Sequence, residues 1–198
     1  ISAASSSLTF KSTDYLRFLP AANWNGSAPT LTVALIDSST TVSTNATVDV
    51  STRGGTTAYS SSTVTLSNTV NAVNDAPVAS GSATLTAIDE DTANPSGATV
   101  SSLFSSNFSD STDTVSGGSS ANTLAGIAIT SYTRDATKGE WQYSTNGSSW
   151  TTIGSSISAA SSSLTFKSTD YLRFLPAANW NGSAPTLTVA LIDSSTTV

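Results

Sequence analysis

The sequence predicts a folded all-β chain built as an antiparallel, two-sheet β-sandwich. Short runs rich in Val, Ile, Thr, Leu and aromatic residues, each bounded by Gly, Ser, Asn or Pro, have the pattern of β-strands. Helical spacing is nowhere sustained. About eight or nine such runs fall within each stretch of about 156 residues, which fits two sheets that bury alternate apolar residues between them.

The expected strands follow one another along the chain with short polar connections. The clearest pair surrounds Asn146-Gly147, a dipeptide that tolerates positive φ in a tight turn, so the aromatic runs from Trp141 to Trp150 should form a hairpin. We expect strands over 14–19, 30–36, 46–51, 61–70, 82–88, 98–104, 126–133, 140–144, 149–153, 170–175 and 186–192.

The aromatic residues argue for a packed structure. Only 10% of the 198 residues are charged, while 40 are Ser and 33 are Thr, and a chain so poor in charge is either disordered or solubilised by hydroxyl groups. The aromatic residues within alternating runs favour folding, and we expect them to pack in the core or on a sheet face rather than to form a ligand platform. These are Trp24, Tyr132, Trp141, Trp150, Phe174 and Trp180.

The composition excludes several kinds of chemistry. There is no Cys and no His, so the chain has no thiolate nucleophile, imidazole base, zinc site of the usual ligands or disulfide framework. The net charge of −6 disfavours nucleic acids and anionic membrane surfaces as partners. No apolar run approaches the ~18 residues of a membrane span. A divalent cation bound by oxygen atoms is the partner that this composition favours.

The chain repeats itself. Residues 1–42 recur letter for letter as residues 157–198, so the period is 157 − 1 = 156 residues. A period of this length matches one whole domain rather than a solenoid turn or a propeller blade. The sequence is therefore interpreted as a window on a tandem array of near-identical domains, with the window out of register with the domain boundaries.

The boundary between repeats is expected at residues 72–77. Pro77 cannot donate to a β-ladder, so the segment around Asn74 and Asp75 suits an extended linker. Residues 1–74 are then the C-terminal half of one repeat. Residues 78–198 are the N-terminal part of the next, without its last strands, whose equivalent is the segment 43–74.

The cut register predicts an association between molecules. An incomplete sandwich leaves sheet edges and apolar faces open, so segment 43–74 of one molecule is expected to complete 78–198 of another by strand complementation. Such a contact is head to tail. The alternative is that residues 1–74 form a partial sandwich by themselves and that the protein stays monomeric.

Acidic residues and Asn gather in the linker and near the ends of expected strands. Calcium takes six to eight oxygen ligands from carboxylates, amides and carbonyls, so these clusters have suitable chemistry. Three adjacent carboxylates alternate in direction along a strand, so the Asp-Glu-Asp run needs the linker to complete a compact site. For Asp110 and Asp113 a solvated loop with Asx turns is the alternative. The candidates are Asn74, Asp75, Asp89, Glu90, Asp91, Asp37, Asp193, Asp110 and Asp113.

Several ordered motifs resemble the tandem extender repeats of very large bacterial adhesins, the cadherin-like repeats secreted with RTX proteins. The motifs are VNDAPV, TAIDEDTANPSGATVSSLF, GIAITSYT, GEWQYSTNGSSWTTI and DYLRFLPAANWNGSAPTLTVALID. Glu90 with Asn94-Pro95-Ser96-Gly97 is similar to the cadherin Glu-Asn-x-Pro-x-Gly run. The resemblance implies an Ig-like or cadherin-like sandwich, type I secretion and an extracellular place on the bacterial surface.

The same resemblance implies calcium between domains. Asn74, Asp75 and Glu90 carry over as ligands, and Asp89 or Asp91 as supplementary ones. The chain has no clear counterpart of the cadherin DRE or DxD motifs. It also has no glycine-rich RTX nonapeptide, so it is not the calcium-loaded secretion region of such a protein.

The leading functional hypothesis is a calcium-stiffened spacer that projects a ligand-binding domain for cell adhesion or biofilm formation. The array gains length with each copy, and calcium at each joint would restrict the linker. The alternative is a multivalent carbohydrate- or ice-binding module that uses aromatic or threonine side chains. An enzyme is not predicted, because the carboxylates offer no arrangement beyond proximity in sequence.

Overall fold

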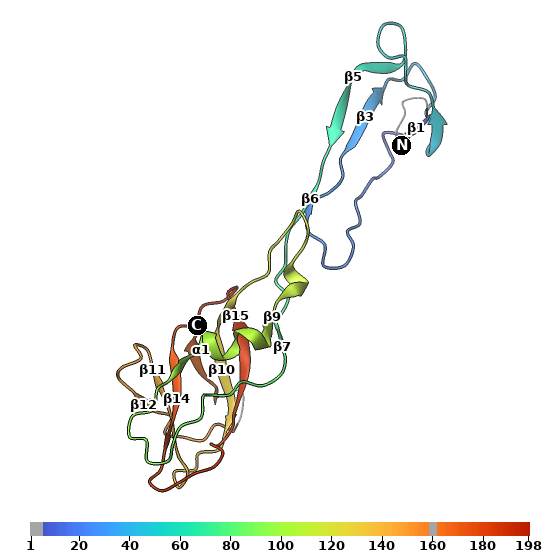
Figure 1. Ribbon diagram of the computed structural model, residues 1–198. Helices are drawn as coiled ribbons and strands as arrows, with labels where there is room; N and C mark the ends of the chain where they lie inside the picture. The colour runs from blue at the N-terminus through green and yellow to red at the C-terminus, as the bar shows by residue number, and fades with distance from the viewer. Residues whose placement is uncertain (1–5, 159–161) are drawn as a thin grey trace. The chain divides into compact units, whose positions relative to one another are not determined.

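The computed structural model describes residues 6–158 and 162–198, so residues 1–5 and 159–161 of the repeated segment lie outside the described residues. The chain divides into two compact units. Unit 1 comprises Ile1–Ala72 together with Val115–Ser119, and unit 2 comprises Val73–Thr114 together with Ser120–Val198. Each unit is described by itself below (Figure 1).

Unit 1 consists of antiparallel strand pairs. Its strands are β1 (Ser7–Thr9), β2 (Gly26–Ser27), β3 (Leu31–Ile36), β4 (Ala46–Val48), β5 (Tyr59–Leu66) and β6 (Thr69–Val70). β1 pairs with β4, β2 with β6 and β3 with β5. In the longest of these pairs, Leu31 lies opposite Leu66 and Val33 opposite Val64.

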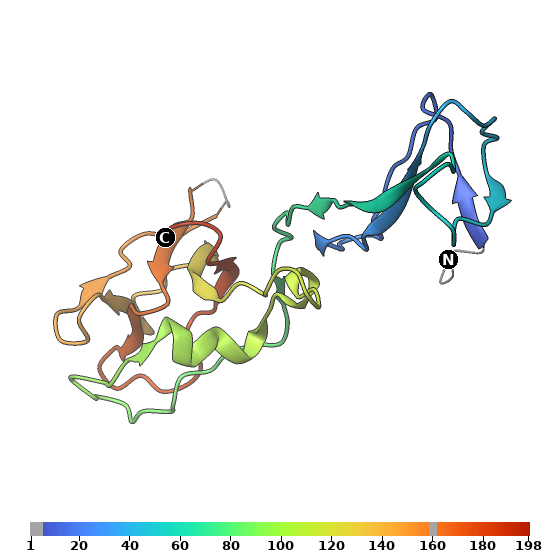
Figure 2. The ribbon, with the colours of Figure 1, turned by 90° about the horizontal axis from the view of Figure 1, so that it is seen from above.

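Unit 2 contains a three-stranded sheet of order β13-β10-β15, a four-stranded sheet of order β12-β11-β14-β8 and the pair β7-β9. Among the described residues it has one short α-helix, which the 3₁₀ turn η2 continues (Figure 2). Its elements are β7 (Val78–Ala79), β8 (Ala98–Thr99), α1 (Val100–Phe104), η2 (Ser105–Asn107), β9 (Phe108–Ser109), η3 (Ser111–Asp113), β10 (Leu124–Tyr132), β11 (Gly139–Ser144), β12 (Thr151–Thr152), β13 (Leu164–Lys167), β14 (Tyr171–Pro176) and β15 (Leu187–Asp193).

The core of unit 2 draws residues from both of its larger sheets. Ile127 and Ile129 of β10 are fully buried, and Leu172 of β14 is 1% exposed. Val100 of α1 packs into the same cluster. Removing these side chains from water supplies about 25 cal/mol for each Å² of apolar surface. The all-β class predicted from the sequence is therefore confirmed.

Identical sequences have different environments in the two units. Leu172 has its copy in Leu16, which is 51% exposed, and Phe166, 5% exposed, has its copy in Phe10, 40% exposed. In unit 2 these side chains lie on β13 and β14, which pair with β10 and β11. Unit 1 has no segment equivalent to β10 or β11. Its described residues 6–42 therefore leave exposed apolar side chains, such as Phe10 and Leu16, whose copies unit 2 buries.

Most expected strands occur with shifted ends, and three expectations were wrong. Residues 98–104 form β8 followed by α1, because Thr99 caps the helix by accepting a 3.0 Å hydrogen bond from the Ser102 amide. Residues 82–88 belong to no strand. Residues 14–19 form no strand, although their copy 170–175 lies almost entirely in β14, because β14 pairs with β11 and unit 1 lacks that partner.

The hairpin around Asn146 is confirmed, with a loop longer than a two-residue turn. Tyr143 of β11 lies opposite Thr151 of β12. Gly147 has a φ of 71°, and the Asn146 side chain accepts hydrogen bonds from the amides of the two serines that follow. This side-chain bonding closes the loop in place of a two-residue backbone turn.

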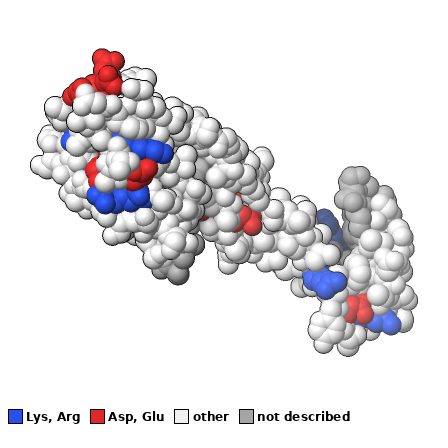
Figure 3. Space-filling model, turned by 90° about the horizontal axis from the view of Figure 1, so that it is seen from below, with Lys and Arg blue, Asp and Glu red and all other residues white. Residues whose placement is uncertain are grey.

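The surface carries few charges. On the face shown in Figure 3, Lys and Arg and Asp and Glu occupy small areas of a mostly uncharged surface. Within the described residues, no helix has the length and apolarity needed to cross a membrane.

Candidate metal centre

Unit 2 brings together five oxygen-bearing side chains from four parts of its sequence. Asn74 precedes β7, and Asp110 and Asp113 lie at the start and end of η3. Asn122 precedes β10, and Asp193 ends β15. Because all five positions lie at or beyond the ends of elements, folding of unit 2 places them at one edge.

The three carboxyl groups of this cluster are buried. Asp110, Asp113 and Asp193 are 5%, 6% and 5% exposed. Burying a carboxylate is costly unless hydrogen bonds or a cation offset the loss of water. The two described ion pairs, Arg134–Glu140 and Lys138–Asp135, include neither Asp110 nor Asp193. Hydrogen bonds therefore hold Asp110 and Asp193 within this cluster.

The linker binds to two of these carboxyl groups. The Asn74 side-chain amide donates to Oδ2 of Asp193 at 3.3 Å. The backbone N–H of Asp75 donates to Oδ1 of Asp113 at 3.0 Å. Through these two bonds the residues that precede β7 are fixed to the end of β15 and to η3.

Asn122 connects the members of the cluster. Its backbone N–H donates to Oδ2 of Asp110 at 2.5 Å, and its side-chain amide donates to Oδ1 of Asn74 at 2.5 Å and, more weakly, to Oδ2 of Asp113 at 3.5 Å. Its own Oδ1 accepts a hydrogen bond from the hydroxyl of Ser194. Sequence analysis missed Asn122, although its position just before a predicted strand is the same signal that identified the aspartates.

One oxygen of the cluster has no donor. Oδ1 of Asp110 is buried and accepts no hydrogen bond. A buried carboxylate oxygen without a partner costs about 1–3 kcal/mol or more, which a cation or a water molecule at that point would offset. This oxygen is the feature of the cluster that most favours a bound metal ion.

Hydrogen bonds lower the pKa of Asp193 below its usual value. The largest cause is the Ser195 hydroxyl, which donates to Oδ1, and the Ser195 amide and the Asn74 side chain act in the same direction, while burial opposes them. The ionised form of Asp193 is thus the form that this site stabilises.

The copy of Asp193 in unit 1 is Asp37, another of the predicted ligands. Asp37 accepts the same local bonds from Ser39, whose amide donates at 2.8 Å and whose hydroxyl donates at 2.5 Å. These bonds also lower the pKa of Asp37. Asp37 is exposed, however, and its local bonds form an Asx-type turn. The linker bond is what distinguishes Asp193 from its copy.

The Asp-Glu-Asp run lies apart from this cluster. Glu90 accepts a 3.0 Å hydrogen bond from the Asn181 side chain, and Asp91 accepts one of 2.7 Å from the Asn179 amide. Asp89 contributes its backbone carbonyl to a bond from Thr92, and all three acidic residues are exposed. The hydrogen bonds of Glu90 and Asp91 thus go to the connection between β14 and β15, and the bond of Asp89 is local.

A cationic side chain occupies the region similar to the cadherin run. Arg173 is 6% exposed and donates to Oδ1 of Asn94 at 2.6 Å and to the carbonyl of Pro95 at 3.1 Å. It also donates to Oε1 of Gln142 at 2.7 Å and lies 4.1 Å from the centre of the Trp150 ring. Oδ1 of Asn94 and the Pro95 carbonyl therefore bind a guanidinium group here.

The carboxyl groups do not meet around one point. Among residues 6–158 and 162–198 there is no group of three or more acidic or histidine side chains close enough to hold a metal ion. The amides of Asn74 and Asn122 lie between the aspartates and bridge them. The cluster is therefore a network of carboxylate acceptors held by amide donors. A rotation of the Asn74 or Asn122 side-chain amide would turn its oxygen, in place of its N–H₂, toward the carboxylates.

No family model, no curated protein and no solved structure matches the chain.

Proposed function

We propose that the chain is part of a structural extender of a bacterial surface adhesin. In this proposal each repeat is an Ig-like β-sandwich, and calcium at each linker stiffens the array into a rod that projects a ligand-binding domain for cell adhesion or biofilm formation. The observation that carries the proposal is the letter-for-letter recurrence of 42 residues at a spacing of 156, next to a linker bonded to buried aspartates.

The recurrence favours length as the useful property. A catalytic or binding site is retained by its few essential residues, whereas identity over 42 consecutive residues keeps the whole surface and core alike. Equal domains in a row add reach in proportion to their number. Multivalent binding also uses copies, but in unit 2 aromatic rings pack against one another, as Trp141 and Phe174 do edge to face at 5.6 Å.

Calcium would act on the linker through the cluster. Because Asp110, Asp113 and Asp193 do not meet around one point, calcium would have to draw their carboxylates together. Rotation of the Asn74 and Asn122 side chains would add amide oxygens, which completes a donor set of the kind that calcium takes. An ion bound by Asn74 and Asp193 together would join these two residues more firmly than their 3.3 Å hydrogen bond does. The loss of linker freedom is the proposed source of stiffness.

The calcium concentration outside cells suits such a switch. Extracellular modules bind calcium with dissociation constants of about 0.1–1 mM. Sites of this affinity fill outside the cell and stay empty at the low calcium level inside it. The rod would therefore stiffen only after export to the cell surface.

The test is calorimetric titration of the chain with calcium, using two variants in identical local sequence. Asp193→Asn alters the cluster, and Asp37→Asn makes the same change within the same Leu-Ile-Asp-Ser-Ser sequence in unit 1. We expect saturable binding at about 0.1–1 mM calcium in the parent chain and in Asp37→Asn, with binding lost or at least about tenfold weaker in Asp193→Asn. Equal binding by all three proteins would refute the assignment of the site, and no binding by any would refute the role of calcium.

A further inference from the structure

The strand β15 has one unpaired edge. It is the last strand in the order β13-β10-β15, and no other strand of the described chain pairs with it. On its paired side the register runs from Leu124 opposite Asp193 to Tyr132 opposite Leu187. An open edge of seven residues presents unpaired backbone donors and acceptors, which are a template for another strand.

The repeat within this chain shows which strand fits that edge. Strand β3, with the sequence LTVALI, is the copy of the first six residues of β15, and it pairs with β5 in antiparallel register. The same residues therefore already bind a YSSSTVTL strand in unit 1. In unit 2 they have no such partner.

The open edge of β15 is the edge that β3 uses. In unit 1 the amides of Leu35 and Asp37 point toward β5, because they donate to the Ser60 hydroxyl and to the Ala58 carbonyl. The copies of these residues are Leu191 and Asp193. In unit 2 the Thr188 carbonyl accepts from the Thr130 hydroxyl of β10, so residue 188 faces β10. Along a strand, the backbone N–H and C=O groups of successive residues point to opposite edges. The backbone groups of Val189 and Leu191 therefore point away from β10, toward the open edge.

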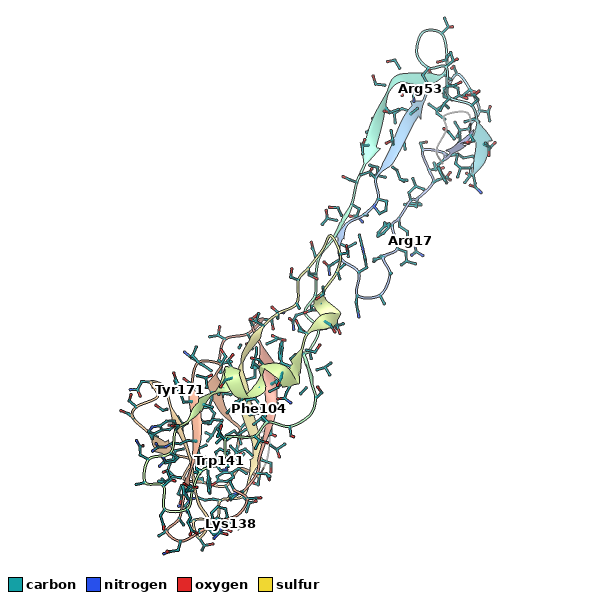
Figure 4. The ribbon with its side chains drawn as sticks, in the orientation of Figure 1. Arg17, Arg53, Phe104, Lys138, Trp141 and Tyr171 are labelled. Atoms are coloured by element: carbon teal, nitrogen blue, oxygen red, sulfur yellow. The ribbon has the colours of Figure 1, made fainter. Side chains whose placement is uncertain are left out.

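A groove adjoins this open edge. It has a volume of about 890 Å³ and lies between β15 and the extended segment 79–90, which was expected to form a strand over 82–88 and belongs to none. Its wall includes Ala83, Leu85, Trp141, Leu187, Val189 and Leu191. Figure 4 shows Trp141, and Phe104, which also lines the groove, within the body of unit 2. A strand placed here would have apolar contacts on its inner face and segment 79–90 near its other edge.

We propose that this groove binds the strand Tyr59–Leu66 of a second copy of the chain, in the register seen between β3 and β5. The incoming Val64 then lies opposite Val189, and Leu66 lies opposite Leu187, as Val64 and Leu66 lie opposite Val33 and Leu31 in unit 1. The donor strand exchanges one LTVALI partner for an identical one. It gains the apolar wall of the groove, whereas Val64 and Leu66 are 52% and 51% exposed in unit 1.

A second copy is favoured over the chain's own β5. In the proposed register Leu66 lies at the Leu187 end of β15, while Asn74 is bonded to Asp193 at the opposite end. Six steps along a strand span about 20 Å, so the eight residues after Leu66 would have to turn and run back along β15 through most of their extended reach of about 26 Å. A donor from another molecule has no such restriction. Each copy then offers one donor strand and one acceptor groove, an arrangement that forms open chains or rings.

The first test uses the full chain and a synthetic peptide of residues 57–68. We expect saturable binding, with hydrogen exchange at the Val189 and Leu191 amides slowed by at least about tenfold and exchange at Thr188 and Ala190 unchanged, because these already face β10. Peptide Val64→Asp places a carboxylate on the inner face and should bind at least about tenfold more weakly, whereas Thr65→Asp places it on the outer face and should bind like the parent. No binding, or equal binding by both variant peptides, would overturn the proposal.

The second test decides whether a second copy is the donor. Light scattering on the full chain should show a mass that rises with concentration, and an excess of the 57–68 peptide should return the protein to monomers by occupying the groove. A monomer at every concentration would overturn the assignment to a second copy. Association that the peptide does not reverse would overturn it as well, because the contact would then lie elsewhere.

Discussion

The side-chain amide of Asn74 donates a 3.3 Å hydrogen bond to Oδ2 of Asp193, a residue 119 positions later in the chain. This bond ties the linker to the end of β15. The copy of Asp193, Asp37, has the same neighbours in sequence and makes the same bonds to the serine two residues later, but it is exposed and contacts no linker. The repeated segment thus provides internal controls for the predictions that follow.

The first prediction concerns the core. Leu172→Ala removes a side chain that is 1% exposed and should destabilise unit 2 by about 2–5 kcal/mol, through lost burial and the cavity left behind. Leu16→Ala makes the same change at a copy that is 51% exposed, and it should cost less than about 1 kcal/mol. Hydrogen exchange measures both losses, at the Ile127 and Ile129 amides for unit 2 and at the Val33 and Val64 amides, which lie in the paired strands β3 and β5, for unit 1. Equal losses in both variants would contradict the difference in burial.

The second prediction concerns the buried guanidinium. Arg173→Ala leaves the side-chain oxygens of Asn94 and Gln142 without their donor, so we expect a loss of about 2–3 kcal/mol in denaturant unfolding. The copy of Arg173 in unit 1 is Arg17, which is exposed. Arg17→Ala should therefore change the free energy of unfolding by no more than about 0.5 kcal/mol.

A conservative change separates charge from geometry at the same position. Arg173→Lys keeps the charge but cannot reach Asn94, Pro95 and Gln142 together. Its free energy of unfolding should therefore fall between that of the parent and that of Arg173→Ala. A Lys variant as stable as the parent would show that the hydrogen-bond geometry contributes little.

The third prediction concerns pH. Hydrogen bonds from Ser195 and Asn74 lower the pKa of Asp193 in the folded state. Asp193 therefore contributes stability above its unfolded pKa of about 3.9, and this contribution is lost as the pH falls through the lower, folded value. Asp193→Asn should reduce the slope of stability against pH below about pH 4. Identical slopes for the parent and the variant in acid-unfolding curves would contradict the assigned cause.

Local sequence was enough to predict the strands that have strong alternating patterns. β10, β11 and β15 were expected from their apolar and aromatic residues, and the hairpin after β11 was expected from Asn146-Gly147. The helix α1 was missed because it is only one turn and a half long, too short for helical spacing to appear. The Thr99 cap was the only local signal of it.

Sequence alone could not decide which copy of a segment forms a strand. Residues 14–19 and 170–175 are identical, yet only the second stretch forms β14, because β11 is available to pair with it. The same reasoning applies to 82–88, whose alternating pattern predicted a strand and which has no paired neighbour. Pairing partners, rather than propensity, decide these cases.

The candidate site was predictable in part. The linker and the strand-end aspartates were identified from their positions, and the structure places Asn74, Asp75, Asp110, Asp113 and Asp193 in one network. The expectation that Glu90 joins them came from the cadherin resemblance, and Glu90 bonds instead to Asn181. The position of Arg173 beside Asn94 spans 79 residues and has no local signal.

Small-angle scattering of the chain with and without calcium shows whether calcium stiffens the linker. With about 1 mM calcium we expect the scattering profile to change from that of a flexibly linked protein toward that of a single extended shape, in the parent and in Asp37→Asn but not in Asp193→Asn. A profile that stays the same in the parent at this calcium concentration, or that changes equally in Asp193→Asn, would contradict a linker stiffened by calcium at this cluster.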